Sequence, residues 1–155
     1  MSIPEFRAYD KREKNLIYNQ DLWLPRSLQN IGHTVYPVHI TEDGIHYRLN
    51  CLSNHYEHDW EEDVVTCYGI EIMAFTGFWD HEEPRKKIYC NDIISIIPKE
   101  NSDLPSSSQT GRIIFCQGSK EWIVVDKKEH YLEKLSQVNC PRVIGNWFDN
   151  AELLE

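Results

Sequence analysis

Short strand-like runs that end in turn signals recur along this chain of 155 residues. The pattern is strongest in three segments, Phe6–Asp10, Phe75–Ile94 and Val143–Asn150. β-Branched and aromatic residues suit a pleated sheet, whereas Gly, Asn and Asp favour the tight turns between strands. None of the three contains a phosphate-binding loop or an obvious nucleophile–base pair. The segments therefore predict an architecture and do not by themselves indicate an activity.

Size and aromatic content agree with a β-rich protein. A chain of this length forms one domain, or one barrel with a small appended lobe. It buries enough apolar surface to need no disulfide staple. Its 5 Trp, 8 Tyr and 5 Phe suit β structure, because flat rings pack well on pleated surfaces.

The charge balance is acidic, with 25 Asp and Glu against 16 Lys and Arg and a formal net charge of −9. Such a charge repels the phosphate backbone of duplex nucleic acid at long range, so we expect duplex binding to be disfavoured. It suits a soluble cytoplasmic protein, or a protein whose partner is basic.

Cysteine usage predicts a reducing compartment. The five cysteines, Cys51, Cys67, Cys90, Cys116 and Cys140, are odd in number and form no Cys-x-x-Cys pair. The sequence opens without the apolar core of a signal peptide, and no apolar stretch reaches membrane-spanning length. We therefore expect free thiols, a cytoplasmic location and no membrane partner.

Residues 1–66 are predicted to form a hairpin followed by an irregular, β-rich lobe. The hairpin spans residues 3–20 and turns at a charged stretch. Residues 45–49 alternate between apolar and polar side chains, as a half-buried strand does. The polar and acidic stretch 53–63 predicts a solvated loop or a short helix.

Further along, a strand within residues 64–75 is expected to be broken at Gly77. Residues 80–87 predict a charged loop, and the apolar, β-branched run 88–97 predicts one buried strand. The polar, Ser-rich stretch 98–110 has no periodicity and predicts a mobile loop.

The C-terminal part continues with a hairpin formed by residues 111–116 and 122–125. Residues 129–138 carry leucines with charges between them, which favours one short amphipathic helix. A last strand at 142–148 and a terminal helical turn at 151–154 follow. Short strands joined by tight turns, with one helix near the end, are typical of a small, strongly bent barrel.

Four stretches resemble the YopX family of phage and prophage proteins, in the family's own order. Residues 6–10, Phe-Arg-Ala-Tyr-Asp, look like its opening Phe-Arg-Ala-Trp-Asp. Residues 73–80 resemble its Met-Gln-Tyr-Thr-Gly-Leu-x-Asp, and residues 87–94 its Glu-Ile-Tyr-Glu-Gly-Asp-Ile-Val. Residues 143–154 look like its closing Val-Ile-Gly-Asn-Ile-Tyr-Glu-Asn-Pro-Glu-Leu-Leu. We refer to these stretches as the four family segments.

Three departures from the family pattern concern turns. Asn91 stands where the family usually has Gly, Ala151 replaces Pro, and residues 82–86 replace an Asn-Gly-like turn. Among the residue types, Asn ranks second to Gly in tolerating a left-handed backbone conformation. We therefore expect the turn at Asn91 to survive and the fold to be kept.

The resemblance implies a fold and an assembly, but no established activity. It implies an SH3-type barrel in residues 67–155, a smaller irregular lobe in residues 1–66, and self-association into a homo-oligomer. Whether the two parts pack as one unit is left open. The family brings no catalytic residues to carry over, so the resemblance assigns none to this chain.

One cluster has the residue types of a metal site. Cys51, His55, His58 and Asp59, joined by Cys67, offer ligands that zinc accepts. Structural zinc sites usually have short ligand pairs at both ends, and only one end is paired here. A solvated polar segment is therefore the interpretation we prefer, with no metal and no cofactor. Metal analysis of protein purified without chelator tests it.

The candidates for catalytic residues are as weak as the candidate metal site. Cys90, Cys116 and Cys140 lie in or beside apolar strands and are expected to be core residues. His130 forms only a loose sequence pairing with Cys140. The acidic runs 61–63 and 82–83 fit solvated loops better than paired catalytic acids. We expect the protein not to be an enzyme.

The five tryptophans suggest where contacts with other molecules are made. Trp122 and Trp147 lie in predicted strands and are expected in the core. Trp60 and Trp79 fall in acidic loops, and they form the candidate interaction surface. A protein interface is favoured there over a groove for peptide or single-stranded nucleic acid.

Three hypotheses of function follow. The first is a phage- or prophage-derived accessory protein that acts by binding or self-assembly. The second is an acidic anti-defence or regulatory protein that binds a basic host protein. The third and weakest is a metal-dependent enzyme built around His55 and His58.

Overall fold

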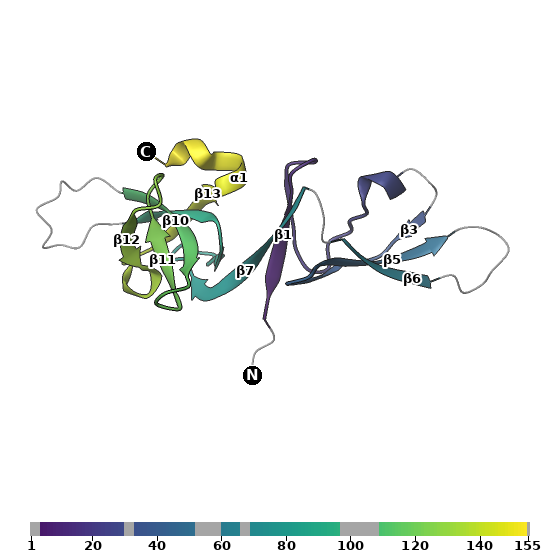
Figure 1. Cartoon of the computed structure of the whole chain (residues 1–155), viewed down its shortest axis with the longest axis horizontal. Helices are drawn as coiled ribbons and strands as arrows, with labels where there is room; N and C mark the ends of the chain where they lie inside the picture. The colour runs from purple at the N-terminus through teal and green to yellow at the C-terminus, as the bar shows by residue number, and fades with distance from the viewer. Residues whose placement is uncertain (1–3, 30–32, 52–59, 66–68, 97–108, 155) are drawn as a thin grey trace, which may run out of the picture. The chain divides into compact units, whose positions relative to one another are not determined.

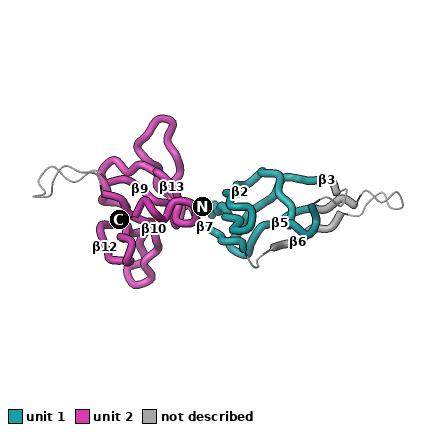
Figure 2. The backbone as a smooth tube through the Cα atoms, turned by 90° about the horizontal axis from the view of Figure 1, so that it is seen from above, with its two compact units in different colours: residues 1–74 teal, residues 75–155 magenta. Residues whose placement is uncertain are grey.

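The computed structural model describes residues 4–29, 33–51, 60–65, 69–96 and 109–154. Most of these residues lie in strands, so the predicted mainly β class is confirmed. The chain divides into two compact units, residues 1–74 and 75–155 (Figure 2). The division occurs within one long strand. The predicted boundary between residues 66 and 67 stays a prediction.

Unit 1 contains six complete strands, one shared strand and a short 3-10 helix in its described part. These are β1 (Phe6–Asp10), β2 (Asn15–Ile17), η1 (Arg26–Leu28), β3 (His33–Val35), β4 (His39–Thr41), β5 (Gly44–Cys51), β6 (Trp60–Val65) and the first half of β7 (Ile70–Trp79).

The predicted N-terminal hairpin is confirmed, because β1 and β2 pair antiparallel with Ala8 opposite Ile17. On its other edge β1 pairs with β7, which places Ala8 opposite Ile72. A second sheet forms around β5, which pairs with β3, β4 and β6 (Figure 1). The core of the unit consists of Ala8, Ile17, Trp23, Leu24, Val38, Ile40, Ile45 and Tyr47.

The prediction of a loop or helix at residues 53–63 is wrong for the part that the structure describes. Residues 60–65 form β6 and pair with β5, with Asp63 opposite Tyr47. The acidic composition hid this strand, because strand formation depends on an available partner more than on intrinsic preference. Residues 52–59 lie outside the described part.

The described part of unit 2 contains the second half of β7, six further strands and three short helical turns. These are β8 (Lys87–Tyr89), β9 (Asp92–Ile96), β10 (Gln109–Cys116), β11 (Glu121–Val125), β12 (Tyr131–Lys134), η2 (Leu135–Gln137), β13 (Arg142–Asn146), α1 (Trp147–Asn150) and η3 (Ala151–Leu153).

Five of these strands form one curled antiparallel sheet in the order β12-β11-β10-β9-β13 (Figure 1). The predicted hairpin of β10 and β11 is confirmed, with Ile114 opposite Ile123. The sheet encloses an apolar core. Its buried members are Ile88, Ile94, Ile113, Val124 and Leu135. The SH3-type detail of this curled sheet stays a prediction.

The strand predicted to break at Gly77 continues to Trp79. Gly77 has φ of +87°, a conformation that glycine adopts without steric cost. The register between β7 and β8 shifts between Phe75 and Trp79, as it does at a β-bulge. The glycine therefore bends the strand without ending it.

The single strand predicted at residues 88–97 is two strands, β8 and β9, joined by a tight turn at Cys90 and Asn91. Asn91 has φ of 68°, so the expected left-handed turn at this departure from the family pattern is confirmed. The apolar run hid the turn, because β-branched residues flank it closely. Of the mobile loop predicted at residues 98–110, residues 98–108 lie outside the described part. The prediction is wrong for residues 109 and 110, which begin β10.

The amphipathic helix predicted at residues 129–138 is wrong. Residues 131–134 form β12, which pairs with β11 and places Ile123 opposite Lys134, and a 3-10 turn follows. The last strand, predicted at residues 142–148, ends at Asn146, because α1 begins at Trp147. The terminal helical turn is confirmed as η3.

Candidate interaction surface

Buried polar side chains identify what the four family segments do. Among the described residues, every buried polar or charged side chain lies in one of these segments. The set consists of Arg7, Asp10, Thr76, Asp80, Asp92 and Asn146. Buried polar groups are stable only when they are hydrogen-bonded, so their partners show the role of each segment.

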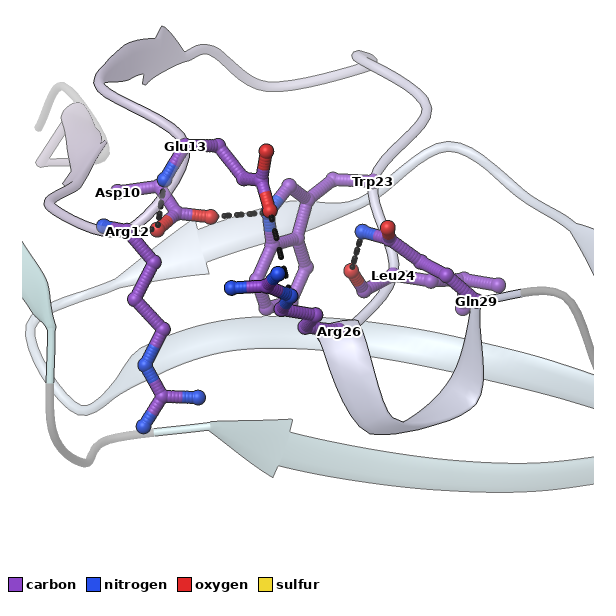
Figure 3. Close-up of polar contacts among 7 residues, drawn as sticks. All are labelled: Asp10, Arg12, Glu13, Trp23, Leu24, Arg26 and Gln29. Atoms are coloured by element: carbon purple, nitrogen blue, oxygen red, sulfur yellow. Dashed lines mark hydrogen bonds and ion pairs between the residues drawn. The ribbon is translucent and has the colours of Figure 1, made fainter.

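Asp10 closes the turn between β1 and β2 (Figure 3). Its Oδ1 accepts hydrogen bonds from the backbone N–H groups of Arg12 and Glu13, at 2.9 and 3.2 Å. Its Oδ2 accepts one from the indole N–H of Trp23 at 3.2 Å. One carboxylate thus holds the hairpin turn and fixes a core tryptophan.

Asp80 organises the loop that follows β7. Its Oδ1 accepts from the backbone N–H groups of Lys86 and Glu82, at 2.8 and 3.3 Å. Its Oδ2 accepts from the N–H of Val143 at 3.3 Å and so ties the loop to β13. Nearby, the Thr76 hydroxyl donates to a strand carbonyl at 2.7 Å and accepts a backbone N–H at 3.1 Å.

Two of the other three residues hold turns in the same way. Asp92 accepts the backbone N–H of Tyr89 at 2.8 Å across the β8–β9 turn. Asn146 is the N-cap of α1, and its Oδ1 accepts the N–H groups of Phe148 and Asp149 at 3.0 Å each. Five of the six buried polar side chains therefore satisfy backbone groups of their own chain.

A row of aromatic side chains follows one face of β7 and β8. Tyr89 is buried, and its ring centroid lies 5.7 Å from that of Phe75. The Phe75 centroid lies 6.0 Å from that of Trp79, with the rings nearly perpendicular. The row ends at Trp79, which keeps 47% of its surface exposed.

Lys87 brings a positive charge onto this row. Its Nζ lies 5.5 Å from the ring centroids of both Phe75 and Trp79, within the range of a cation–π interaction. Arg85 and Lys86, which precede it, are exposed. We call Phe75, Trp79, Arg85, Lys86 and Lys87 the basic aromatic hairpin.

The structure changes the setting of the predicted interaction residues. Trp60 and Trp79 lie in strands β6 and β7, so their placement in acidic loops is wrong. Trp79 is exposed, whereas the side chain of Trp60 lies outside the described part. Sequence reasoning missed Phe75 and Lys87, although the run Arg85-Lys86-Lys87 was visible as a signal in the sequence.

Trp122 and Trp147 were both expected in strands. Trp122 lies in β11 and packs against the core of unit 2, as predicted. Trp147 begins α1 and is half-buried, with the Arg112 guanidinium carbon 4.2 Å from its ring centroid. Arg112 Nε also donates to Asn91 Oδ1 at 3.0 Å, which ties the β8–β9 turn to β10.

The cysteine predictions fail in part. Cys90 and Cys116 are half-buried and Cys140 is exposed, so the expected core position of Cys140 is wrong. His130 Nδ1 lies 3.3 Å from Asp126 Oδ2. The candidate metal ligands His55, His58, Asp59 and Cys67 lie outside the described residues, as does the side chain of Cys51. The part of the chain that is described contains no cluster of metal-ligating side chains.

Cys116 has a testable reactivity. The pKa of its thiol is lowered, mainly because the Ser119 side chain hydrogen-bonds to the sulfur, and the backbone of Ser119 adds to the effect. We expect its alkylation by iodoacetamide to reach half-maximal rate at a lower pH than that of an ordinary thiol. Ser119→Ala should raise this midpoint. Peptide mass spectrometry across a pH series measures it, and an unchanged midpoint in the variant contradicts the assignment.

The comparisons with known proteins decide the family. The model of the YopX protein family matches residues 5–155, which is nearly the whole chain. The chain belongs to the YopX protein family. The comparison with curated proteins returned no match. Within the described residues, no helix is long and apolar enough to cross a membrane.

Two solved structures of similar fold extend this result. The crystal structure of the YopX protein of Bacillus subtilis has a TM-score of 0.51 and 22% sequence identity. That of a protein of Enterococcus faecalis has a TM-score of 0.53 and 19% identity. Each comparison covers 100% of both chains. At these identities the likeness supports the fold alone.

Proposed function

We propose that this YopX-family protein acts by binding and self-assembly, without catalytic turnover, as a phage- or prophage-derived accessory protein in the cytoplasm. The observation that carries the proposal is the use of the buried polar residues. Five of the six hold turns and strand ends of their own chain, as hydrogen-bond partners of backbone groups. The family segments thus stabilise the fold, and contacts with other molecules are left to the exposed side chains.

The basic aromatic hairpin supports a contact role. Protein interfaces are enriched in aromatic residues and arginine, and the residues of greatest energetic importance in them are often Trp, Tyr and Arg. Trp79 is 47% exposed at the end of an ordered row of rings. Such a ring is held ready for a partner, because its neighbours already restrict its orientation.

Self-assembly is testable by size-exclusion chromatography with light scattering. The monomer has a mass of 18.4 kDa. We expect a mass of at least twice this value at micromolar concentration and low salt. A strict monomer under these conditions contradicts the proposal. Its cytoplasmic location is tested separately by cell fractionation.

A second candidate is an acidic regulator that binds a basic host protein, in the manner of an anti-defence protein. Residues 41–74 favour it, because they contain eight Asp and Glu and a single Arg. Affinity capture from host lysate at low salt tests it. The variant E42K/D43K reverses the charge of the exposed pair Glu42 and Asp43. This variant should no longer capture the partner. Recovery of no partner by the wild-type protein contradicts this candidate.

A further inference from the structure

We infer that the basic aromatic hairpin of one copy binds the exposed acidic turn Glu42–Asp43 of unit 1 in another copy, and we call this turn the acidic surface. This inference rests on the proposed self-assembly and names the surfaces that make it. It commits to a second copy of this chain as the occupant of the hairpin. The supporting observations are the exposed ring of Trp79, the local positive charge and the uneven distribution of acidic residues.

The apolar side chains of the hairpin are already ordered before a partner binds. Phe75, Trp79 and Lys87 hold one another at 5.5–6.0 Å, so the indole ring loses little conformational freedom when a partner covers it. Tyr89 anchors the row in the interior. Burial of the exposed part of Trp79 is favourable in proportion to the apolar area removed from water.

The charge of the hairpin is opposite to that of the molecule. Arg85-Lys86-Lys87 is the only run of three basic residues in the sequence. Of the acidic residues beside it, Asp80 is buried and bound by backbone N–H groups. Glu82 forms an ion pair with Arg142 at 2.7 Å. Glu83 is exposed, but the two exposed cations Arg85 and Lys86 outnumber it and can attract an anionic surface.

The complementary surface is present in the same chain. Unit 1 contains 12 Asp and Glu and 6 Lys and Arg, which gives a net charge of −6. Unit 2 contains 13 Asp and Glu and 10 Lys and Arg, which gives a net charge of −3. Within unit 1, residues 41–74 alone have eight acidic residues and one basic residue, a net charge of −7. Glu42 and Asp43 are exposed at the turn between β4 and β5. This turn presents two adjacent, exposed carboxylates, which complement the exposed cations Arg85 and Lys86.

Two different surfaces meeting in this way allow closed assemblies. The hairpin and acidic surface of two copies can pair reciprocally in a dimer, or each copy can bind the next in a ring. Both arrangements place opposite charges in contact. Charge reversal on either surface should therefore abolish assembly, and reversal on both should restore it.

The test uses two charge-reversed variants of the full chain, R85E/K86E and E42K/D43K. We expect each alone to have the monomer mass by light scattering at micromolar concentration, because like charges then face each other. A 1:1 mixture should again form oligomers of at least the dimer mass, since each surface of one variant complements the other variant. Restoration in the mixture also shows that both variants are folded.

Two further variants isolate the hairpin. Trp79→Ala should weaken assembly by about 30-fold, the effect expected of a central aromatic contact. The matched control K127E/K128E makes the same change of charge at exposed residues of unit 2 and should keep the wild-type mass. Raising the salt concentration from about 0.05 to 0.5 M should weaken wild-type assembly, because it shortens the range of charge attraction.

The outcomes separate the two proposals. A monomeric wild-type protein overturns the proposed self-assembly itself. A wild-type oligomer that keeps its mass with R85E/K86E, or variants that fail to recover when mixed, overturns only the assignment of surfaces. Labelled single-stranded oligo(dT) serves as a further probe of the hairpin. If R85E/K86E abolishes its binding without changing the oligomer mass, the hairpin is a nucleic-acid site and the inference is wrong.

Discussion

Replacing Asp80 by Ala should lower the free energy of unfolding by about 3 kcal/mol, because it removes the acceptor of a buried network. Asp80 is 2% exposed and accepts the backbone N–H groups of Glu82, Lys86 and Val143. In the variant these donors have lost their partner, and an unsatisfied buried donor costs about 1–3 kcal/mol. For a chain of this size the melting temperature should fall by about 6–12 °C.

Thermal and urea unfolding followed by circular dichroism measure the effect of Asp80→Ala. Glu83→Ala is the matched control, because Glu83 is an exposed carboxylate of the same loop. It should change stability by less than about 0.5 kcal/mol. Asp80→Asn keeps one acceptor oxygen, so the free energy of unfolding of this variant should lie between those of D80A and E83A. A D80A protein as stable as the E83A protein would show that the loop is not organised by this carboxylate.

Gly111→Ala should lower the free energy of unfolding by about 2 kcal/mol, as overpacking of a filled core does. Gly111 is buried in β10, and a Cβ atom placed there would overlap Val124 Cγ1. It would also lie 3.2 Å from the carbonyl oxygen of Val125 and 3.3 Å from Leu132 Cδ1. Val124 is fully buried and its β-branched side chain has little rotational freedom, so it gives way only at a cost.

Gly118→Ala is the control for Gly111→Ala. A Cβ at Gly118 meets only Cys116 Sγ, at 4.0 Å, so this exposed turn has room for it. The change should be neutral or stabilising by about 0.4–1 kcal/mol, because alanine restricts the unfolded chain. A double-mutant cycle with Val124→Ala should show favourable coupling, since the smaller side chain relieves the overlap. Additive effects would mean that Val124 is not the neighbour that resists the substitution.

The four family segments were informative because they combine strand residues with turn residues at fixed positions. Asp10, Asp80 and Asn146 were visible in the sequence as the polar ends of apolar runs. Their burial and their bonds to backbone N–H groups were not visible, because those donors include residues as distant as Val143 from Asp80. Sequence spacing locates a turn, but it does not reveal which strand end the turn will hold.

The sequence was limited in the same way as a guide to the candidate interaction surface. Trp79 was singled out in the sequence as an interaction residue, but its neighbour Lys87 lies across the β7–β8 pairing. The bulge at Gly77 sets the register that brings Lys87 beside Phe75 and Trp79. A helix was predicted where β12 stands, and a solvated loop or short helix was predicted over most of β6. Both strands depend on pairing partners that the local sequence does not reveal.

The sequence by itself determined the mainly β class and the hairpins of β1–β2 and β10–β11. These features depend on residues that are close in the chain, through alternation of side chains and the conformational freedom of Asn and Gly. Only the tertiary structure decided the strand identity of residues 60–65 and 131–134 and the row of rings that ends at Trp79. Those features arise from pairing between strands, whose register is set by packing of the whole sheet.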